Sequence, residues 1–475
     1  MDEPYFNRED RISRLQDELI HYILSFVDTK YAVQTSVLSK RWVDIWKSLP
    51  VLNFNRSSFS EGKQDSFIMF VDMVLFFRKD FDIQRFSVDW RNLAYDRSAI
   101  MNVNRWTSLG AVKYNVQEIS ILITQCPAYE IPHRLLNSKS LRKLVINVFS
   151  NPGYVDIILP SSMSLPKLTE LTLHGLSISN VESSRRLFSS CPVLRNLSIG
   201  ECNIQTSNQR KLIVDSPSLK NFEYADYYCC GHLLPQNDTV VNFIKLCASN
   251  VEFFSCKSFL TQDYSLEISS PLLVVYFHIT LNAKEEDENA ETYEKLPLKE
   301  KAVYAKRMMK FLGAVNMVQG LRLSPGFLEV LSQAPDLLDC QPPRLCNLLY
   351  LVLEMWPTRA CLRAMAYLLM VSPNIARLVL TSKESKLAQV GDGWEAGLSL
   401  PGMLSHLKFV RIEEVEGCDA ELKLLSFLLK NAKNLEEVVL EYRSNIDSPE
   451  GARQFQDKLR LVPTASSNIQ MVFKT

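Results

Sequence analysis

A six-residue apolar pattern recurs along most of the chain and constrains its fold more than any other feature. The pattern is apolar-x-x-apolar-x-apolar, and it occurs in series from about residue 80 onward. Thirteen copies begin at Ile83, Val116, Leu141, Leu168, Leu194, Leu219, Val251, Leu273, Val318, Leu348, Ile375, Leu407 and Leu435. One such match is common by chance, but thirteen in series indicate a repeated structural unit.

Each copy predicts a short β-strand in which alternate residues point inward. When such strands stack in parallel, their inward side chains line up as one continuous core. From Leu141 to Leu219 the copies start 27, 26 and 25 residues apart, within the roughly 20–29 residues typical of leucine-rich repeats. The gap reaches 45 residues between Leu273 and Val318. We therefore predict an irregular leucine-rich-repeat array with parallel strands over 80–390; the alternative is an ordinary α/β domain.

Composition narrows the possible functions. The 475 residues carry 53 Lys+Arg and 53 Asp+Glu, so no overall charge favours nucleic acid as a partner. We expect no membrane span, because the most apolar windows are shorter than the ~20 residues that a bilayer requires. The N-terminus is acidic rather than typical of a signal peptide. None of the 11 cysteines forms C-x-x-C, which favours free thiols in a reducing compartment, the nucleus or the cytoplasm.

The segment from Leu15 to Leu49 has three short helical patterns. Leu19, Ile23 and Val27 recur with helical spacing, and Trp42 and Trp46 do so in the third pattern before Pro50 ends it. A module this small buries little surface when alone. Its apolar faces therefore indicate either a separate partner or packing against the rest of this chain.

The residues of this segment resemble the F-box of plant proteins. The resemblance extends from Asp10 to Trp46 and includes the run Val37-Leu38-Ser39-Lys40-Arg41-Trp42. It implies an F-box over 8–55, a three-helix module that binds a Skp-type adaptor and, through it, a cullin. By resemblance, the adaptor-binding residues are the apolar positions of the motif: Leu15, Leu19, Ile23, Leu24, Val37, Leu38 and Trp42.

Two residues depart from the F-box pattern. Gln16 and Asp28 occupy positions where the motif usually has proline. Neither change removes an apolar anchor, but both are expected to weaken adaptor binding.

The resemblance continues toward the C-terminus. The stretch from Leu400 to Glu436, with Leu428-Leu429-Lys430-Asn431-Ala432, resembles the FBD block that ends many plant F-box proteins with leucine-rich repeats. It implies an FBD region over 395–475 that continues the array. A charged insertion over 284–301 is expected to lie at the surface.

No catalytic, metal or cofactor site is predicted. The chain lacks the sequence motifs of common hydrolases and nucleotide-binding proteins, and its six histidines are far apart in sequence. The local group Cys229, Cys230 and His232 has no second ligand pair at a standard distance, so free thiols explain it better than zinc.

Together these features predict the substrate-recognition subunit of a Skp-cullin-F-box ubiquitin ligase. The alternative is a protein-interaction scaffold with a weakened F-box and no ligase role. The protein target is unknown. It is expected to bind the strand face of the repeats, where the outward positions are apolar in the C-terminal half, unless FBD helices or the end of the chain cover that face. The predicted target-binding residues are Tyr350, Val352, Val379 and Phe409.

Overall fold

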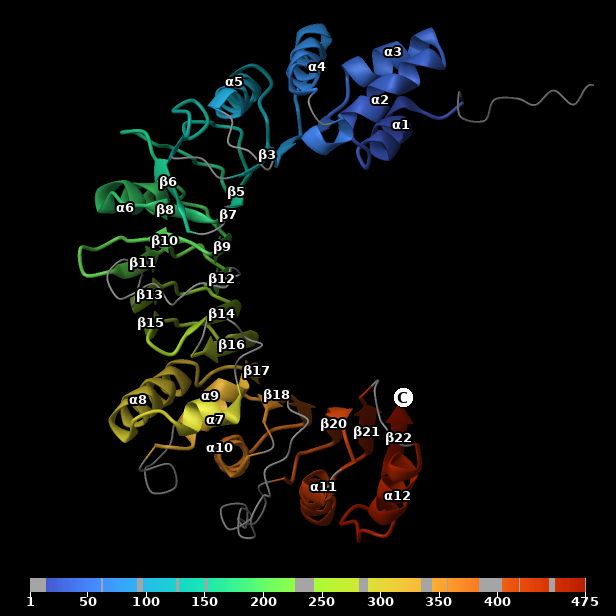
Figure 1. The fold of residues 1–475 in the computed structure, drawn as a ribbon, viewed down its shortest axis with the longest axis vertical. Coiled ribbons are helices and arrows are strands. Elements are labelled where there is room, and N and C mark those ends of the chain that lie inside the picture. Colours follow the sequence, from blue (N-terminus) through green and yellow to red (C-terminus); the bar gives the residue numbers. More distant parts are fainter. Residues whose placement is uncertain are drawn as a thin grey trace, which may run out of the picture. The chain divides into compact units, whose positions relative to one another are not determined.

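The computed structural model describes residues 14–60, 63–91, 97–124, 128–149, 153–226, 243–281, 289–334, 344–356, 358–383, 404–417, 419–443 and 449–474. The chain forms two compact units, drawn in sequence colours in Figure 1. Unit 1 comprises residues 1–195 and 202–204, and unit 2 comprises residues 196–201 and 205–475.

Unit 1 begins with a helical module and continues as strands with helices between them. The helices are α1 (Asp17–Leu24), α2 (Thr29–Gln34), η1 (Thr35–Val37), α3 (Lys40–Lys47), η2 (Arg56–Ser58), α4 (Gln64–Phe77), α5 (Arg97–Lys113) and α6 (Val181–Ser189). The strands are β1 (Val51–Asn55), β2 (Arg85–Trp90), β3 (Glu118–Thr124), β4 (Ala128–Glu130), β5 (Lys143–Phe149), β6 (Val155–Ile158), β7 (Glu170–His174), β8 (Leu176–Ile178) and β10 (Asn203–Ile204).

The strands of unit 1 form parallel sheets. The main sheet runs β1-β2-β3-β5-β7, and a smaller sheet runs β10-β8-β6-β4. Aromatic rings join the first helices to the main sheet: Trp90 of β2 stacks on Trp106 of α5 with ring centroids 5.9 Å apart, and Phe67 of α4 meets both rings edge-on. This buried cluster fixes α4 and α5 on one face of the sheet.

Unit 2 is a longer run of the same kind. Its strands are β9 (Asn196–Gly200), β11 (Lys211–Asp215), β12 (Asn221–Ala225), β13 (Phe243–Cys247), β14 (Phe253–Phe259), β15 (Asp263–Glu267), β16 (Val274–Thr280), β17 (Gly320–Leu323), β18 (Tyr350–Met355), β19 (Arg377–Ser382), β20 (Phe409–Val415), β21 (Glu437–Tyr442) and β22 (Gln470–Lys474). Its helices are α7 (Ala290–Glu294), α8 (Leu298–Ala314), α9 (Pro325–Leu331), α10 (Arg359–Val371), α11 (Asp419–Asn431) and α12 (Pro449–Arg460).

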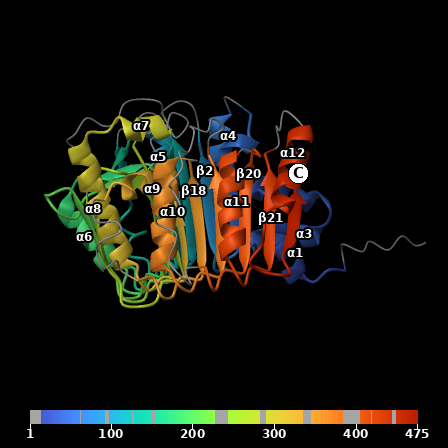
Figure 2. The ribbon, with the colours of Figure 1, turned by 90° about the horizontal axis from the view of Figure 1, so that it is seen from below.

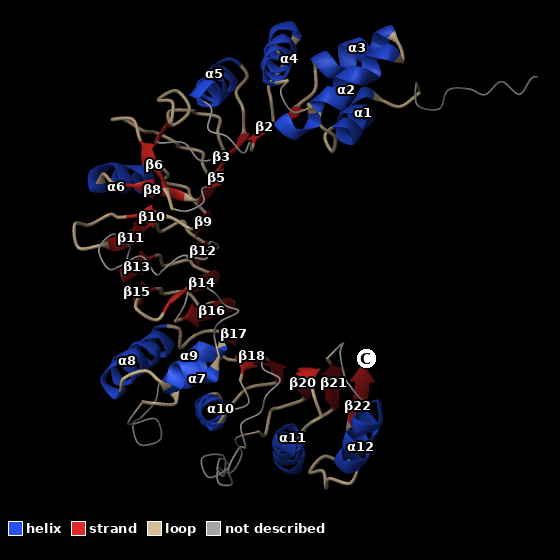
Figure 3. Cartoon of the chain, viewed as in Figure 1, coloured by secondary structure: helices blue, strands red, loops and turns tan. Residues whose placement is uncertain are grey.

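The main sheet of unit 2 has a helix-covered face and an open face. It runs β9-β12-β14-β16-β17-β18-β19-β20-β21-β22, with neighbouring strands paired in parallel. Phe277 of β16 stacks on Phe311 of α8 at 3.9 Å and meets Phe327 of α9, so its side of the sheet faces the helices. Helices α10 and α11 lie across the same face of the later strands (Figure 2). Beside β12 and β14, the small sheet β11-β13-β15 takes the position that helices take beside the later strands (Figure 3).

The predicted α/β class with a helical N-terminal module and a long series of parallel strands is confirmed. One repeat was predicted one residue out of register. The buried pattern of β16 is Leu272-x-x-Val275-x-Phe277, whereas Leu273 is exposed. Because a shift of one residue moves every side chain of a strand to the other face, the copy predicted to start at Leu273 was wrong.

Helix α9 of unit 2 is tightly enclosed, since all seven of its residues are buried. A Cβ atom added to Gly326 would lie 2.1 Å from the hydroxyl oxygen of Tyr293 and 2.8 Å from the carbonyl oxygen of Ile279. Glu329 is buried as well, and its carboxylate accepts hydrogen bonds from Thr358 Oγ1 and, at 3.5 Å, from Cys361 Sγ. Burial raises the pKa of Glu329, and these hydrogen bonds oppose that rise only in part.

Within the ranges that the structure describes, no helix combines the length and the apolar character needed to cross a bilayer.

Candidate functional site

The helical module at the start of unit 1 has its own core. Ile20 and Leu24 of α1 and Trp42, Ile45 and Trp46 of α3 are buried. The spacing of three or four residues within each helix places these side chains on one face, and α1 packs against α3 through them. The module therefore has a defined shape to present to a partner.

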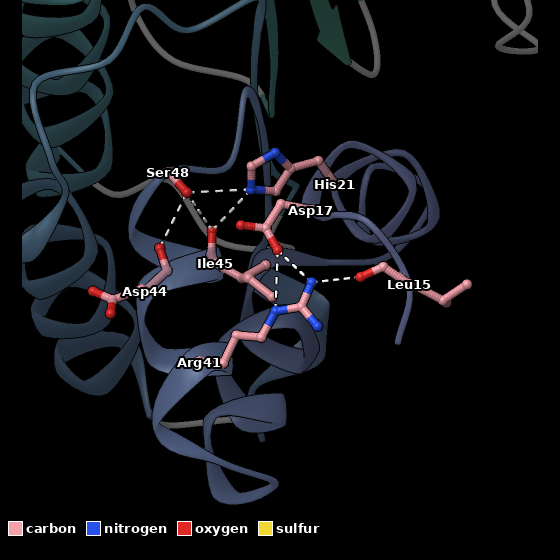
Figure 4. Close-up of polar contacts among 7 residues, drawn as sticks. All are labelled: Leu15, Asp17, His21, Arg41, Asp44, Ile45 and Ser48. Atoms are coloured by element: carbon pink, nitrogen blue, oxygen red, sulfur yellow. Dashed lines mark hydrogen bonds and ion pairs between the residues drawn. The ribbon is translucent and has the colours of Figure 1, made fainter. Parts of the chain in front are cut away.

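Polar contacts fix the relative orientation of α1 and α3 (Figure 4). The guanidinium group of Arg41 donates to the Asp17 carboxylate at 2.5 Å and to the carbonyl oxygen of Leu15 at 2.5 Å. His21 Nε2 lies 3.3 Å from the carbonyl oxygen of Ile45 and 3.2 Å from Ser48 Oγ. Because the Arg41–Asp17 pair is largely exposed, it contributes little to stability and more to orientation.

The outer side of the module is apolar. Val37 is 86% exposed and Phe26 is 71% exposed, and Tyr22 meets Phe26 edge-on at 5.0 Å. We call the exposed apolar residues of α1, α2, η1 and their connections the module surface: Leu19, Tyr22, Ile23, Phe26, Val27, Tyr31, Val37 and Leu38. So many large apolar side chains on one small module mark a contact region.

The structure divides the seven residues predicted to bind an adaptor. Leu19, Ile23, Val37 and Leu38 belong to the module surface, and Leu15 is half-buried. Leu24 and Trp42 are buried inside the module, where they hold its helices together. Adaptor binding by these residues stays a prediction. Sequence reasoning overlooked Tyr22, Phe26 and Tyr31, although Leu19, Tyr22, Ile23 and Phe26 follow the i, i+3, i+4, i+7 spacing of one helix face.

Asp28 joins the module to the first strand of the sheet. Its carboxylate caps α2 by accepting from Lys30 N at 2.7 Å, and it also accepts from Asn55 N at 3.0 Å and from Ser58 Oγ at 3.1 Å. Next to it, Thr29 Oγ1 accepts from Asn53 N at 2.8 Å. We call these four hydrogen bonds the Asp28 latch. The residue that departs from the motif thus has a structural role that a proline does not supply.

Gln16 has no comparable role. It is the N-cap of α1, where its carbonyl oxygen accepts from Leu19 N and Ile20 N, both at 3.1 Å, but its side chain makes no capping hydrogen bond. A proline would pre-set the backbone at this helix start, whereas Gln16 does not.

The predicted target-binding residues all lie on the open strand face of unit 2. Their side chains point to the side of the sheet opposite to that of Leu351, Leu378 and Val410, which are fully buried. Tyr350 is 41% exposed and Phe409 is half-buried, but Val352 and Val379 are only 8% and 6% exposed. The predicted exposed apolar strip is therefore interrupted at Val352 and Val379. Target binding by the four residues stays a prediction.

Charged side chains flank these valines in register. Arg322 of β17 donates to Glu354 at 2.7 Å, and Lys383 lies 3.3 Å from the same carboxylate. On the next strands, Arg411 contacts Glu441 at 2.5 Å. Burial works against ionisation of Glu354, but Lys383 and Arg322 outweigh it and lower the pKa of that carboxyl group.

Metal binding receives no support from the part of the chain that the structure describes, where no group of three or more His, Cys, Asp and Glu side chains is placed to hold an ion. Cys229, Cys230 and His232 lie outside the described residues, as do 284–288 of the charged insertion and 395–403, 418, 444–448 and 475 of the predicted FBD region.

Comparisons with family models agree with this architecture. An F-box domain model matches residues 12–54. A model described as the LRR repeats of an FBD-associated F-box protein, At5g56370, matches residues 103–241, and an FBD model matches residues 400–440.

Similar proteins of Arabidopsis thaliana carry two or all three of these domains in their names. The FBD-associated F-box protein At1g66310 is 27% identical over 98% of this chain and 96% of the relative. The F-box/FBD/LRR-repeat protein At1g78750 is 26% identical over 98% of this chain and 96% of the relative. A putative F-box/FBD/LRR-repeat protein, At4g00315, is 33% identical over 44% of this chain and 46% of the relative.

Proposed function

The chain is a plant-type F-box/FBD/LRR-repeat protein, and we propose that it is the substrate-recognition subunit of a Skp-cullin-F-box ubiquitin ligase. The F-box binds a Skp-type adaptor and, through it, the cullin. The repeat body binds the target protein. The observation that carries this proposal is the module surface, which leaves eight large apolar side chains exposed on a module of three short helices.

A surface of this kind is costly to leave in water. Burying a large apolar side chain contributes about 1.5–3 kcal/mol, so a partner that covers several of them gains substantial free energy. The most protruding residues, Val37 and Phe26, are the best candidates for anchors, because a few deeply inserted side chains usually carry most of the binding energy.

The proposed role is non-catalytic. Ubiquitin transfer is carried out by enzymes that the cullin recruits, and this chain contributes proximity by holding the target near them. The six described free cysteines fit a reducing compartment, so we place this activity in the nucleus or the cytoplasm.

The test is a binding measurement between the full chain and a purified Skp-type adaptor. We expect Val37→Asp to raise the Kd at least about 10-fold, because it places a charge in the centre of an apolar contact. Leu461→Asp is the matched control, since Leu461 is 84% exposed but lies outside the F-box. Substitution of the buried Leu24 or Trp42 is less informative, because it disrupts the module itself.

The outcome separates the proposal from its alternative. If Val37→Asp and Leu461→Asp bind the adaptor equally well, the module surface is not the contact. If the unmodified chain forms no complex, the scaffold function gains support. Gln16, which stands where the motif usually has proline and is expected to weaken adaptor binding, points in the same direction.

A further inference from the structure

Helix α4, which follows the F-box in unit 1, has apolar side chains on two faces. One face is buried against the sheet. On the other face, four large apolar side chains are between 47% and 78% exposed, and we call them the α4 strip: Met69, Met73, Phe76 and Phe77. They recur at i, i+4, i+7 and i+8, so they lie on one side of the helix. A helix that is apolar on its outer face as well as its inner face indicates a partner that covers it.

The α4 strip continues the module surface. Lys30 Nζ lies 5.8 Å from the ring centroid of Tyr31, a residue of the module surface, and 4.6 Å from that of Phe59. The ring centroid of Phe59 lies 5.5 Å from that of Phe70, which belongs to α4. Phe70 precedes Met73 by three residues, so the two side chains are neighbours on the helix surface. A series of adjacent side chains therefore leads from the module surface to the α4 strip.

Polar contacts fix the end of α4 against the F-box. Lys79 pairs with Asp44 of α3 at 3.1 Å, and its main-chain N donates to the carbonyl oxygen of Lys47 at 2.9 Å. Arg78 is buried, and its guanidinium group donates to the carbonyl oxygen of Leu49 at 2.6 Å. A buried hydrogen bond from a charged group is a strong constraint, because its loss leaves that charge unsatisfied. The module surface and the α4 strip are thus held in one relative position, which lets a single partner cover both.

We propose that the Skp-type adaptor bound to the module surface also covers the α4 strip. The adaptor interface then extends beyond the F-box, whose family model ends at residue 54. The inference rests on the proposed function and adds a second contact area to it. The adaptor is the occupant rather than the target protein, because the α4 strip adjoins the module surface, whereas the predicted target-binding residues belong to unit 2.

A second contact area fixes the orientation of the bound adaptor. An adaptor held by three short helices alone is free to tilt on them. Helix α4 is anchored to the main sheet through Phe67, whose ring meets those of Trp90 and Trp106 edge-on. Contact with α4 therefore sets the direction in which the strands of unit 1 extend from the adaptor, and fixed geometry is what a subunit that acts by proximity has to supply.

The first experiment measures the Kd between the full chain and a purified Skp-type adaptor. Phe76→Asp tests the α4 strip, since Phe76 is 78% exposed and its substitution leaves the buried face of α4 unchanged. We expect the Kd to rise about 5-fold or more, because a charge replaces a large apolar contact. Leu298→Asp is the matched control: Leu298 is 79% exposed but lies on α8 of unit 2, and its substitution should leave the Kd unchanged.

The second experiment follows methionine oxidation in the unmodified chain. Hydrogen peroxide converts exposed methionine to the sulfoxide, and a partner that covers the side chain slows the reaction. We expect a saturating concentration of adaptor to slow the oxidation of Met69 and Met73 severalfold, as measured by mass spectrometry. Met317, which is 51% exposed in unit 2, is the internal control and should be oxidised at the same rate with and without adaptor.

An unchanged Kd in Phe76→Asp, or unchanged oxidation of Met69 and Met73, would overturn the proposal. So would a dimer of the chain alone in sedimentation that Phe76→Asp dissociates, because a second copy would then cover the α4 strip. If Val37→Asp weakens adaptor binding while the α4 strip responds in neither experiment, the adaptor binds the module surface alone and the proposed ligase role stands. If the unmodified chain forms no complex, the proposed function fails together with this inference.

Discussion

At the scale of single residues, Asp28 shows how one side chain can connect two parts of a unit. Its carboxylate receives three hydrogen bonds, one within α2 and two from residues 27 and 30 positions further along the chain. The sequence marked Asp28 as a departure from a motif and favoured a loss of affinity. It did not indicate these partners, because a contact across the fold leaves no local pattern in the sequence.

We expect Asp28→Ala to lower the free energy of unfolding by about 1–2 kcal/mol, since it removes a helix cap and two further acceptor contacts. The measurement is urea unfolding together with hydrogen exchange at the amide of Asn55. Exchange at Asn55 should accelerate, because that amide loses its acceptor.

Asp80→Ala is the control for this substitution. Asp80 is 82% exposed and pairs with the exposed Lys113, so its removal should leave both measurements nearly unchanged. Slow exchange at Asn55 in Asp28→Ala would show that the latch is not what protects this amide.

Two buried glutamates of unit 2 should respond to pH with opposite signs. Burial raises the pKa of Glu329 above the unfolded value of about 4.3, so the folded state binds more protons and stability falls as pH rises through that window. Glu329→Gln removes this loss. We therefore expect the variant to gain stability relative to the unmodified chain as pH rises above the unfolded pKa of about 4.3, measured by urea unfolding at several pH values.

Glu354→Gln provides the comparison. In the unmodified chain, the pKa of the Glu354 carboxyl group is lowered in the folded state despite burial, because Lys383 and Arg322 favour the carboxylate. Its ionisation therefore stabilises the fold above the unfolded pKa, and this contribution is lost as pH falls through the lower folded value. Glu354→Gln should be less stable than the unmodified chain at pH 7, with the difference shrinking in acid. Parallel pH profiles for both variants would contradict the assignment.

At the scale of elements, two helical glycines differ in their surroundings. Gly326 of α9 lies against the rigid ring of Tyr293 and a main-chain carbonyl, whereas a Cβ atom at Gly313 of α8 would meet nothing within 4 Å. The same substitution should therefore have opposite effects at the two sites.

We expect Gly326→Ala to lower the free energy of unfolding by about 1–3 kcal/mol, because the added methyl group forces α9 away from its neighbours. Gly313→Ala should raise it by up to about 1 kcal/mol through better helix propensity and a less flexible unfolded chain. Thermal and urea unfolding of both variants check this. If Gly326→Ala is neutral, α9 is less tightly enclosed than its buried residues indicate.

The repeated apolar pattern of the sequence predicted some of the strands and missed others. It predicted the main-sheet strands from β2 to β21, though not β1 or β22, because each inward apolar residue is a strong local signal. It failed at β16, since Leu272-Leu273-Val274-Val275 is apolar in both registers and only the three-dimensional packing selects one. The short strands of the smaller sheets β10-β8-β6-β4 and β11-β13-β15 were not predicted, because segments of two to five residues carry little periodicity.

The candidate surfaces were predicted only in part for a related reason. Spacing places Tyr350 and Phe409 on the open face of unit 2, but the burial of Val352 and Val379 depends on long side chains from neighbouring strands.

At the scale of the whole molecule, the two compact units should unfold separately. In repeat structures each repeat contacts only its neighbours, so cooperativity breaks down along a long array. Four of the six tryptophans (Trp42, Trp46, Trp90 and Trp106) lie in unit 1. Helices α7 to α12 lie in unit 2. Fluorescence therefore follows mainly unit 1, and far-UV circular dichroism follows both units.

We expect urea midpoints from fluorescence and circular dichroism to differ. Gly326→Ala should shift part of the dichroism transition and leave the fluorescence midpoint nearly unchanged, because its effect is confined to unit 2. Two superimposable curves that move together in this variant would show that the chain unfolds as one cooperative body.

The Asp28 latch also bears on how such a chain can evolve. Two of its donors, Asn53 N and Asn55 N, are main-chain groups of β1, and Lys30 Nζ reaches a third main-chain atom, the carbonyl oxygen of Ser58, at 2.6 Å. Main-chain groups remain when side chains change. The first repeat can therefore drift in sequence while its attachment to the F-box persists.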